Sequence, residues 1–487
     1  MNQPYYLPTL GSNHKAKQVA AKAQKFVPAY RDFLQSQGIA IGNNWDKLPL
    51  TDKKSYLMAY KYPELLGNDS DQILAFFRSS GSSGNPFYWS YLKSSSRFSV
   101  LGIRIFLERA FAIHQKKTLA VVALGLGSWL AGDYFSALLK SLAMRSRYPF
   151  SVATPGNALA DAIQLIEVTE SLFEQIVILI VPSAIAHLHL KANQLGKNLP
   201  LEKLRYIVLG ESFPESLRSY HQNKAHISEN QPFMFSMYGS TDTGGLGVES
   251  LPTVCLRKLF SNNQALAAEI GIEQPIPAFF HSIARDAFLE TIDGHLCITR
   301  WQGIPLVRYQ IYDKVNFYHW KKLKATILSS PNLQPEDGPL VKIITSASNW
   351  LPNLIAVTGR TDNCLVFGGT NLTEYMLDAV ITSTDLRSLL TGLYQAKIIY
   401  EADKQFLYLD LETHLNIEIN SELEDLVYDS LVQSLSEIEP LFASDYQNLY
   451  IHWDKEPSQR VLRLNFIPYP ALSQATENQI KQRGIIY

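Results

Sequence analysis

The pattern of apolar and polar positions alternates between short apolar runs and amphipathic segments from about residue 118 onward. Thr118–Gly127 and Ile176–Val181 are apolar runs bounded by Gly or Pro, which is typical of buried strands. Asp133–Met144, between them, places Tyr and Leu side chains at helical spacing. Further strands are predicted at Phe150–Thr154, Arg205–Leu209 and Phe233–Tyr238. Because such alternation requires crossover connections, we expect a largely parallel sheet with helices on both faces.

The N-terminal segment and the part of the chain after about residue 280 differ from this alternating pattern. Gln18–Leu34 predicts one amphipathic helix. Extended segments follow one another from about residue 280, at Ala287–Thr291, His295–Thr299, Leu306–Tyr309 and Val315–Phe317. After Gly359–Asp362, helices and strands alternate again, with a helix at Leu423–Ile438 and a strand at Asn448–His452. The predicted fold class is therefore α/β: a large N-terminal domain (residues 1–359) with mostly parallel sheets flanked by helices plus a β-rich portion, and a small C-terminal α+β domain (363–487).

Composition narrows the class of protein. Of 487 residues, 46% are hydrophobic and 18% charged, which is ample material for a core. The 44 Lys and Arg residues nearly balance 45 Asp and Glu residues, so charge gives no reason to expect a nucleic acid partner. The three cysteines lie far apart without a CxxC pair, which predicts neither a disulfide framework nor a zinc site. No apolar stretch reaches the ~20 residues that cross a bilayer, so we expect a cytoplasmic protein without a membrane partner.

Three segments carry candidate chemistry. Ser79–Pro86 (SSGSSGNP) alternates hydroxyls with glycines, so backbone N–H groups and serine side chains can converge on a polyphosphate, although a flexible turn is the alternative. Tyr238–Asp242 (YGSTD) follows a predicted strand and offers an aromatic face, hydroxyls and a carboxylate for Mg²⁺, with a simple turn as the alternative. Gly359–Asp362 (GRTD) lies at the predicted domain junction and has a linker turn as its alternative.

Two other patterns are weaker. Gly125–Trp129 follows a strand and opens a helix, but it lacks the GxGxxG spacing of a dinucleotide-binding turn. No acidic residue that could hold a ribose lies between Asp133 and Asp161, which argues against hydride transfer. His187 and His189 alternate at the start of a predicted helix, so we do not expect them to share a metal ion.

In this order along the chain, the segments resemble motifs of the adenylate-forming (acyl-CoA synthetase-like) superfamily. SSGSSGNP is similar to its Ser/Thr-Gly-rich phosphate loop, LGES (Leu209–Ser212) to the Gly-Glu element beside adenine, and YGSTD to its Tyr-Gly-Ser/Thr-Thr-Glu motif. PLVRYQIYD (Pro305–Asp313) resembles the segment that ends in a ribose-binding aspartate, and GRTD the Gly-Arg-x-Asp hinge. VPAYRDFLQSQGI (Val27–Ile39) and LPLTDKKSYL (Leu48–Leu57) are similar to the opening of phenylacetate–coenzyme A ligases, which also share an Arg-Tyr pair at Arg308-Tyr309.

The resemblance implies an AMP-forming acid–thiol ligase. Such an enzyme converts a carboxylic acid and ATP into an acyl-adenylate and pyrophosphate, and a thiol then takes the acyl group. For this chain we expect an aryl or other hydrophobic acid as substrate, with ATP, Mg²⁺ and coenzyme A as cofactors. The alternative is a catalytically impaired or half-reaction relative that binds nucleotide or acyl-adenylate and passes the acyl group to an amine or a carrier protein. No motif reports the oligomeric state, with which a homodimer is compatible.

The resemblance also assigns residues to the nucleotide. The phosphate loop would comprise Ser79, Ser80, Gly81, Ser82, Ser83 and Gly84. The adenine side would comprise Gly210, Glu211 and Tyr238, with Gly239 and Ser240 in the same motif as Tyr238. Thr241 would contact the α-phosphate, Asp242 would bind Mg²⁺ and Asp313 would accept hydrogen bonds from the ribose. Arg360 would reach the nucleotide from a hinge at 360–362, whose Asp362 is the pivot for a mobile C-terminal domain.

Several positions depart from the family pattern. Asn85 stands where a lysine often precedes the proline, and Asp242 is shorter than the usual glutamate. The catalytic lysine of the C-terminal tail corresponds to Gln479, or to Lys481 if the alignment shifts by two residues. Because the lost lysines would remove positive charge from the phosphates, these departures motivate the half-reaction alternative.

Overall fold

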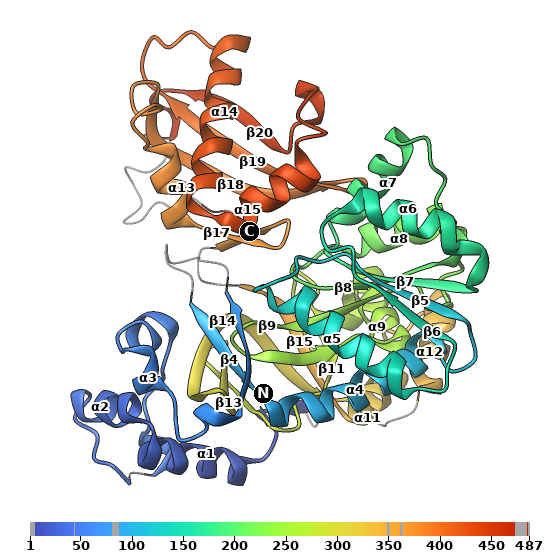
Figure 1. Cartoon of the computed structure of the whole chain (residues 1–487), viewed down its shortest axis with the longest axis vertical. Helices are drawn as coiled ribbons and strands as arrows, with labels where there is room; N and C mark the ends of the chain where they lie inside the picture. The colour runs from blue at the N-terminus through green and yellow to red at the C-terminus, as the bar shows by residue number, and fades with distance from the viewer. Residues whose placement is uncertain are drawn as a thin grey trace.

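The computed structural model describes residues 5–42, 44–79, 87–347, 351–360, 364–472 and 485. Within these residues, a single sheet of 13 strands runs through the large body of the protein (Figure 1). One part of it is parallel, in the order β6 (Phe150–Ala153), β5 (Thr118–Val122), β7 (Gln175–Ile180), β8 (Leu204–Val208) and β9 (Met234–Ser240). The predicted parallel sheet is therefore confirmed.

Helices cover both faces of the parallel strands, as the apolar runs require. In β7, Ile176 and Ile178 pack in one core cluster and Val177 and Leu179 in another, because successive side chains of a strand point to opposite faces. The helices α6 (Leu159–Thr169), α7 (Ala184–Gln194) and α8 (Glu215–Lys224) contribute to the first cluster. The helices α4 (Lys93–Phe111), α5 (Leu130–Arg145) and α9 (Leu251–Asn262) contribute to the second.

The rest of the sheet is antiparallel. From β9 it continues through β10 (Gly244–Val248), β11 (Ala278–Ser282), β15 (Asn353–Arg360), β14 (Ile304–His319), β13 (His295–Gln302), β12 (Phe288–Ile292) and β2 (Thr9–Leu10), while β1 (Tyr6–Leu7) pairs with β14. The helices α10 (Gln264–Glu269), α11 (Trp320–Ser329) and α12 (Gly338–Ser346) join these strands. The extended segments predicted after residue 280 therefore lie in this antiparallel part.

The N-terminal segment forms two helices, α1 (Asn13–Phe26) and α2 (Pro28–Ser36), where the sequence pattern predicted one. The break has a local cause. Pro28 has no N–H to donate, and Val27 before it is extended, at φ −105° and ψ 107°. The short helices η1 (Trp45–Lys47), η2 (Lys53–Leu57), α3 (Tyr62–Leu65) and η3 (Ser70–Gln72) then lead to the hairpin of β3 (Ile73–Arg78) and β4 (Tyr88–Leu92).

Residues 364–472, here called the C-terminal module, form separate sheets above the large body in Figure 1. Strands β18 (Leu390–Glu401), β19 (Lys404–Thr413) and β20 (Leu462–Pro468) form one sheet, and β16 (Cys364–Phe367) and β17 (Thr370–Thr373) another. The helices are α13 (Glu374–Ile381), α14 (Ser421–Ile438), α15 (Pro440–Asp445) and η7 (Tyr446–Tyr450). The division of the chain at 359–363 stays a prediction. Among the described helices, none is long and apolar enough to cross a membrane.

The strand predicted at Asn448–His452 is wrong, because residues Tyr446–Tyr450 form a helical turn that continues α15. Buried Phe442, Leu449 and Tyr450 recur at helical rather than alternating spacing, which keeps them on one side against the core. The third strand of this sheet is instead β20, which pairs in parallel with β19.

Candidate functional site

Three of the predicted site residues meet where β9, β14 and β15 lie near one another. The Tyr238 hydroxyl at the end of β9 donates a hydrogen bond to Asp313 Oδ2 at 2.6 Å. Arg360 Nη1 at the end of β15 lies 3.5 Å from Asp313 Oδ1, since β14 and β15 pair Asp313 directly with Arg360. Asp313 is buried, with 8% of its surface exposed. The Asp313 carboxylate is thus held by one hydroxyl and one cation.

The turn from Gly239 to Asp242 links β9 to β10. A Cβ atom on Gly239 would lie 2.3 Å from the Gly244 carbonyl oxygen, so only glycine fits this close approach of the two strands. Ser240 Oγ lies 3.0 Å from Thr243 Oγ1, and the Tyr91 hydroxyl donates to the Thr241 carbonyl oxygen at 3.2 Å. A hydrogen bond within the turn and another from Tyr91 outside it therefore hold the turn in place.

Asp242 lies at the end of this turn beside β14. Its Oδ2 accepts a hydrogen bond from the Tyr309 hydroxyl at 2.9 Å. Burial raises the pKa of the Asp242 carboxyl, while the Lys53 charge and the Tyr309 hydrogen bond oppose that rise. A single carboxylate of this kind, together with substrate phosphates, is a common donor set for Mg²⁺, so Asp242 fits the ion that the resemblance implies.

Lys53 is a site residue that sequence reasoning missed. Its Nζ donates a hydrogen bond to Ser79 Oγ at 3.3 Å. Burial lowers the pKa of Lys53, whereas Asp242 and Glu439 raise it, so both carboxylates lie within electrostatic reach of this ammonium group. The turn that carries Lys53 is anchored beside Tyr309, because Gln310 N donates to the Thr51 carbonyl oxygen at 2.8 Å. The available signal was two consecutive lysines after Leu48–Leu50, which alone predicts only an exposed turn.

Ser79 marks the base of the predicted phosphate loop. Its backbone N–H donates to the Phe87 carbonyl oxygen at 2.9 Å, which brings the two ends of the loop together. The Gly125–Trp129 loop runs alongside, since Arg78 N donates to the Ser128 carbonyl oxygen at 2.8 Å. The remaining loop residues lie outside the described part of the chain: Ser80, Gly81, Ser82, Ser83, Gly84 and Asn85.

Gly210 and Glu211 follow β8 and lie under the C-terminal module. Gly210 has a left-handed φ of +99°. The Glu211 carboxylate accepts a hydrogen bond from Ser183 N at 2.6 Å and is 8% exposed. Burial raises the pKa of Glu211 to about 7, against the lowering effect of the Ser183 hydrogen bond. The Tyr400 hydroxyl, on β18, donates to the Ser212 carbonyl oxygen at 3.2 Å, so the module rests directly on this element.

Two further carboxylates of the module, Glu439 and Asp445, connect the two halves of the site. Burial raises the pKa of Asp445 well above its usual range, and the charges of Glu211 and Glu439 raise it further. Glu439 is fully buried at the start of α15 and also lies within electrostatic reach of Lys53. The Glu211 element and the Lys53–Asp242 pair therefore face the same end of the module.

The structure thus brings together predicted site residues from four distant segments, and Lys53 from a fifth: Ser79, Tyr238 and Asp242, Asp313, and Arg360. Lys481, Gln479 and Asp362 lie outside the described residues, so their expected roles stay predictions. Two cations beside hydroxyls and two carboxylates can bind an anion that also presents sugar hydroxyls, and can neutralise charge that develops on it.

Neither a protein-family model nor a curated protein sequence matches this chain. The fold of the chain, in contrast, is similar to that of solved structures. A 2-hydroxyisobutyryl-CoA ligase, in complex with 2-HIB-AMP and CoA in the thioesterification state, aligns with a TM-score of 0.54 at 12% identity, covering 97% of this chain and 88% of that chain. An open conformation of that ligase in complex with 2-HIB-AMP and CoA aligns with a TM-score of 0.50 at 12% identity, covering 97% and 90%. Over nearly its whole length, the chain therefore shares the fold of this CoA ligase.

Proposed function

We propose that this protein is an AMP-forming acid–thiol ligase, which activates a carboxylic acid with ATP and transfers the acyl group to a thiol, coenzyme A. The observation that carries the proposal is the meeting of Tyr238, Asp313 and Arg360 at one point. Lys53 and Asp242, with Ser79 at the base of the serine-glycine loop, supply the complementary end for phosphates. The adenylate-forming fold supports the same reading.

In the first step, a carboxylate oxygen of the acid attacks the α-phosphorus of ATP, and the bond from this phosphorus to the bridging oxygen breaks. Pyrophosphate leaves with the electron pair. Lys53 and Arg360 would neutralise the charge that accumulates on the phosphate oxygens, which is the main barrier when one anion attacks another. Asp313 would accept hydrogen bonds from the ribose hydroxyls. Asp242 would hold Mg²⁺ beside the phosphates, and the ion would supply further neutralisation.

In the second step, the sulfur of the thiol attacks the carbonyl carbon of the acyl-adenylate, and AMP leaves with the electron pair of the broken C–O bond. Two reactions at one site require different groups to approach in turn, so we propose rotation of the C-terminal module about residues 360–362. Arg360 ends β15 directly before this hinge. The 2-hydroxyisobutyryl-CoA ligase of similar fold was captured with CoA, which supports coenzyme A as the acceptor.

The aromatic character of the neighbouring loop supports an aryl or hydrophobic acid. Arg78 lies over the Trp129 ring at 5.4 Å, beside the base of the phosphate loop. Tyr91, which contacts Thr241, packs against Tyr134 with ring centroids 6.1 Å apart. These rings would line the acyl pocket next to the turn that we expect to contact the α-phosphate.

Pyrophosphate release with ATP, Mg²⁺ and a panel of aryl and aliphatic acids tests the proposal. We expect release that depends on one class of acid, and acyl-CoA by mass spectrometry when coenzyme A is added. Pyrophosphate release without formation of acyl-CoA, together with an acyl product that forms only when an amine or a carrier protein is added, would show that coenzyme A is not the acceptor. Nucleotide binding by calorimetry without pyrophosphate release from any acid would support the half-reaction alternative and contradict full turnover.

A further inference from the structure

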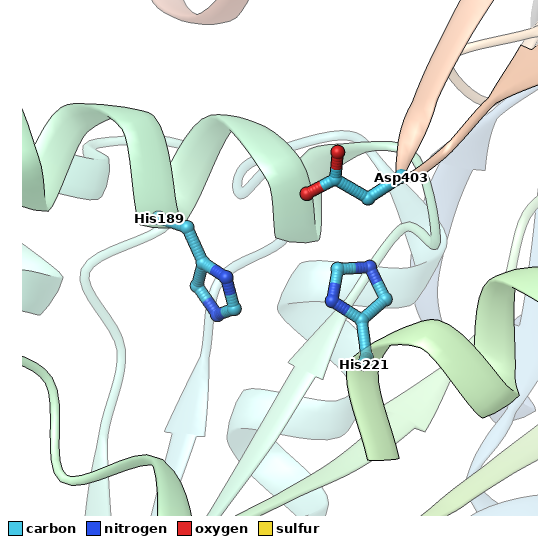
Figure 2. A group of neighbouring side chains, drawn as sticks. All are labelled: His189, His221 and Asp403. Carbon is cyan, nitrogen blue, oxygen red and sulfur yellow. The ribbon is translucent and has the colours of Figure 1, made fainter. Parts of the chain in front are cut away.

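Three side chains with metal-binding atoms come together away from the candidate nucleotide site. His189 lies on α7, His221 on α8, and Asp403 in the turn between β18 and β19 of the C-terminal module. Their ligand atoms all lie within 4.8 Å of one another. Figure 2 shows the two imidazole rings and the carboxylate directed into the same space from three elements. The large body thus contributes two nitrogen donors and the module one oxygen donor.

The two histidines are buried, and three of their four ring nitrogens lack a hydrogen-bond partner among the described residues. His221 is 1% exposed, and neither ring nitrogen has a hydrogen-bond partner among the residues that the structure describes. His189 is 8% exposed, and its Nδ1 also lacks a partner there, while its Nε2 lies 3.3 Å from the Tyr206 hydroxyl. A buried polar atom left unsatisfied destabilises the folded state, so a ligand that satisfies these nitrogens would stabilise the fold.

The donor set matches a particular class of ion. Two imidazoles and one carboxylate, with water as the fourth ligand, form a typical tetrahedral Zn²⁺ site. Metal–ligand bonds of about 2.0–2.2 Å would bring the ligand atoms to about 3.3 Å from one another. Side-chain rotations that shift each ligand atom by roughly an ångström would therefore close the site. The Tyr206 hydroxyl would orient the His189 ring from its far nitrogen, as second partners of metal-bound imidazoles do. Lys224 on α8 is exposed, and its positive charge acts on both imidazoles, so it partly opposes a cation at this site.

We propose that His189, His221 and Asp403 bind one Zn²⁺ ion, which ties the β18–β19 turn of the C-terminal module to α7 and α8. His187, two residues before His189, is not part of this site. Its ring stacks on Trp453 with centroids 3.7 Å apart. The two histidines of the proposed site therefore come from two different helices, α7 and α8, and not from two positions of one helix.

The ion would act on the same hairpin that covers the Gly210–Glu211 element. Asp403 lies three residues after Tyr400, whose hydroxyl contacts Ser212, and two residues before Gln405, whose amide contacts the Tyr400 hydroxyl at 3.0 Å. Bound Zn²⁺ would hold this hairpin down and favour the arrangement of the module described here. The binding site itself does not depend on the proposed ligase function.

Zinc titration of the full chain after chelator treatment, with no ATP or acid present, tests the site separately from the ligase proposal. By calorimetry, we expect one Zn²⁺ per chain, a higher melting temperature with the ion, and visible Co²⁺ absorption of a tetrahedral site. His221→Gln and Asp403→Asn should each weaken binding at least tenfold. His226→Asn is the matched control, because His226 is exposed and has a φ of +54° that asparagine tolerates.

Limited proteolysis tests the tie to the module. Zn²⁺ should slow cleavage of the wild-type chain and leave the cleavage rate of Asp403→Asn unchanged. Absence of stoichiometric Zn²⁺ binding to the wild-type chain would overturn the proposal. Equal affinity of wild type and Asp403→Asn would do so as well. This nearly isosteric variant lies in the turn between two strands and decides the matter if His221→Gln does not fold.

Discussion

The two groups of buried carboxylates at the candidate site differ in what surrounds them. On the large body, Asp313 faces Arg360 and the Tyr238 hydroxyl, and Asp242 faces Lys53 and the Tyr309 hydroxyl. At the C-terminal module, Glu211, Glu439 and Asp445 crowd one another, and their mutual repulsion raises the pKa of Asp445 beyond the effect of burial. Cations and a hydroxyl oppose the effect of burial on Asp242 in the first group, whereas neighbouring carboxylates add to the effect of burial on Asp445 in the second.

This difference assigns the two groups to different tasks: the first to binding the nucleotide, and the second to the contact between the C-terminal module and the large body. Carboxylates that hydroxyls and cations hold in fixed positions can receive ribose hydroxyls or a cation without further rearrangement. Carboxyl groups that favour protons make the contact between module and body depend on pH. Four substitutions test the division, in order of decreasing effect.

Lys53→Met should have the largest effect, because it removes a positive charge from the expected phosphate site. Loss of one such group typically costs about 100-fold in kcat, so pyrophosphate release should fall by about that factor. Lys54→Met is the matched control: Lys54 is the exposed neighbour, and its loss should change the rate by less than about twofold. Equal rates for Lys53→Met and wild type would remove Lys53 from the site.

Asp313→Ala should weaken nucleotide binding by about 1.5–3 kcal/mol, or about 10–100-fold, since the ribose would lose a charged acceptor. Calorimetry with a non-hydrolysable ATP analogue measures the change. Asp425→Ala breaks another aspartate–arginine pair, with Arg460 at 2.6 Å in the module, and should leave nucleotide affinity as it is. Unchanged affinity in Asp313→Ala would mean that the ribose lies elsewhere.

Glu211→Gln should change the pH dependence of stability. The Glu211 carboxyl has an ordinary pKa of 4.5 and a folded-state pKa of about 7. Because the folded protein holds this proton to higher pH than the unfolded chain, stability falls as pH rises from 4.5 to about 7 and then levels off. Glutamine mimics the protonated form, so at about pH 8 the variant should be more stable by about 1–3 kcal/mol, and at about pH 4 equal to wild type.

Urea unfolding at both pH values measures this effect. Asp445, whose pKa is also raised, leaves a residual slope in the same direction, which Glu211→Gln with Asp445→Asn should reduce further. Glu202→Gln, an exposed glutamate shortly before β8, should follow the wild-type profile. Identical profiles for Glu211→Gln and wild type would show that Glu211 is ionised under the module.

Tyr400→Phe should have the smallest effect, about 0.5–1.5 kcal/mol, because it removes one hydroxyl that bonds Ser212 across the contact. The Tyr408 hydroxyl on the same hairpin bonds Glu401 within the module, so Tyr408→Phe is the control. Protease susceptibility should increase for Tyr400→Phe more than for Tyr408→Phe. The reverse order would place the contact elsewhere.

The parts of the fold that could be predicted from sequence are those set by local pattern. Continuous apolar runs such as Ile176–Val181 predict buried strands because both faces of a parallel sheet are covered. Pro28 divides the first helix for a local reason that the spacing of apolar positions does not report. Tyr446–Tyr450 is helical because a short apolar stretch can form a strand or a helix until packing decides.

The site was accessible to sequence reasoning where motifs name residues, as at Tyr238 and Asp313, whose side chains do meet. Lys53 was not, because its place beside Ser79 depends on a turn held against β14. The approach of His189 to His221 depends on how two helices pack, which no spacing along the chain records.

The long strand β14 carries residues at both ends of the candidate site. Tyr309, which meets Asp242, and Asp313, which meets Tyr238, lie four residues apart on its buried side, and the pairing of β14 with β13 is irregular between Gln310 and Lys314. Both ends of the proposed nucleotide site are therefore carried by one strand. A single inserted residue between them would turn Asp313 toward the opposite face of the sheet and leave Tyr309 where it is. Variation in substrate would thus be accommodated by the surrounding loops, while the length of this segment stays fixed.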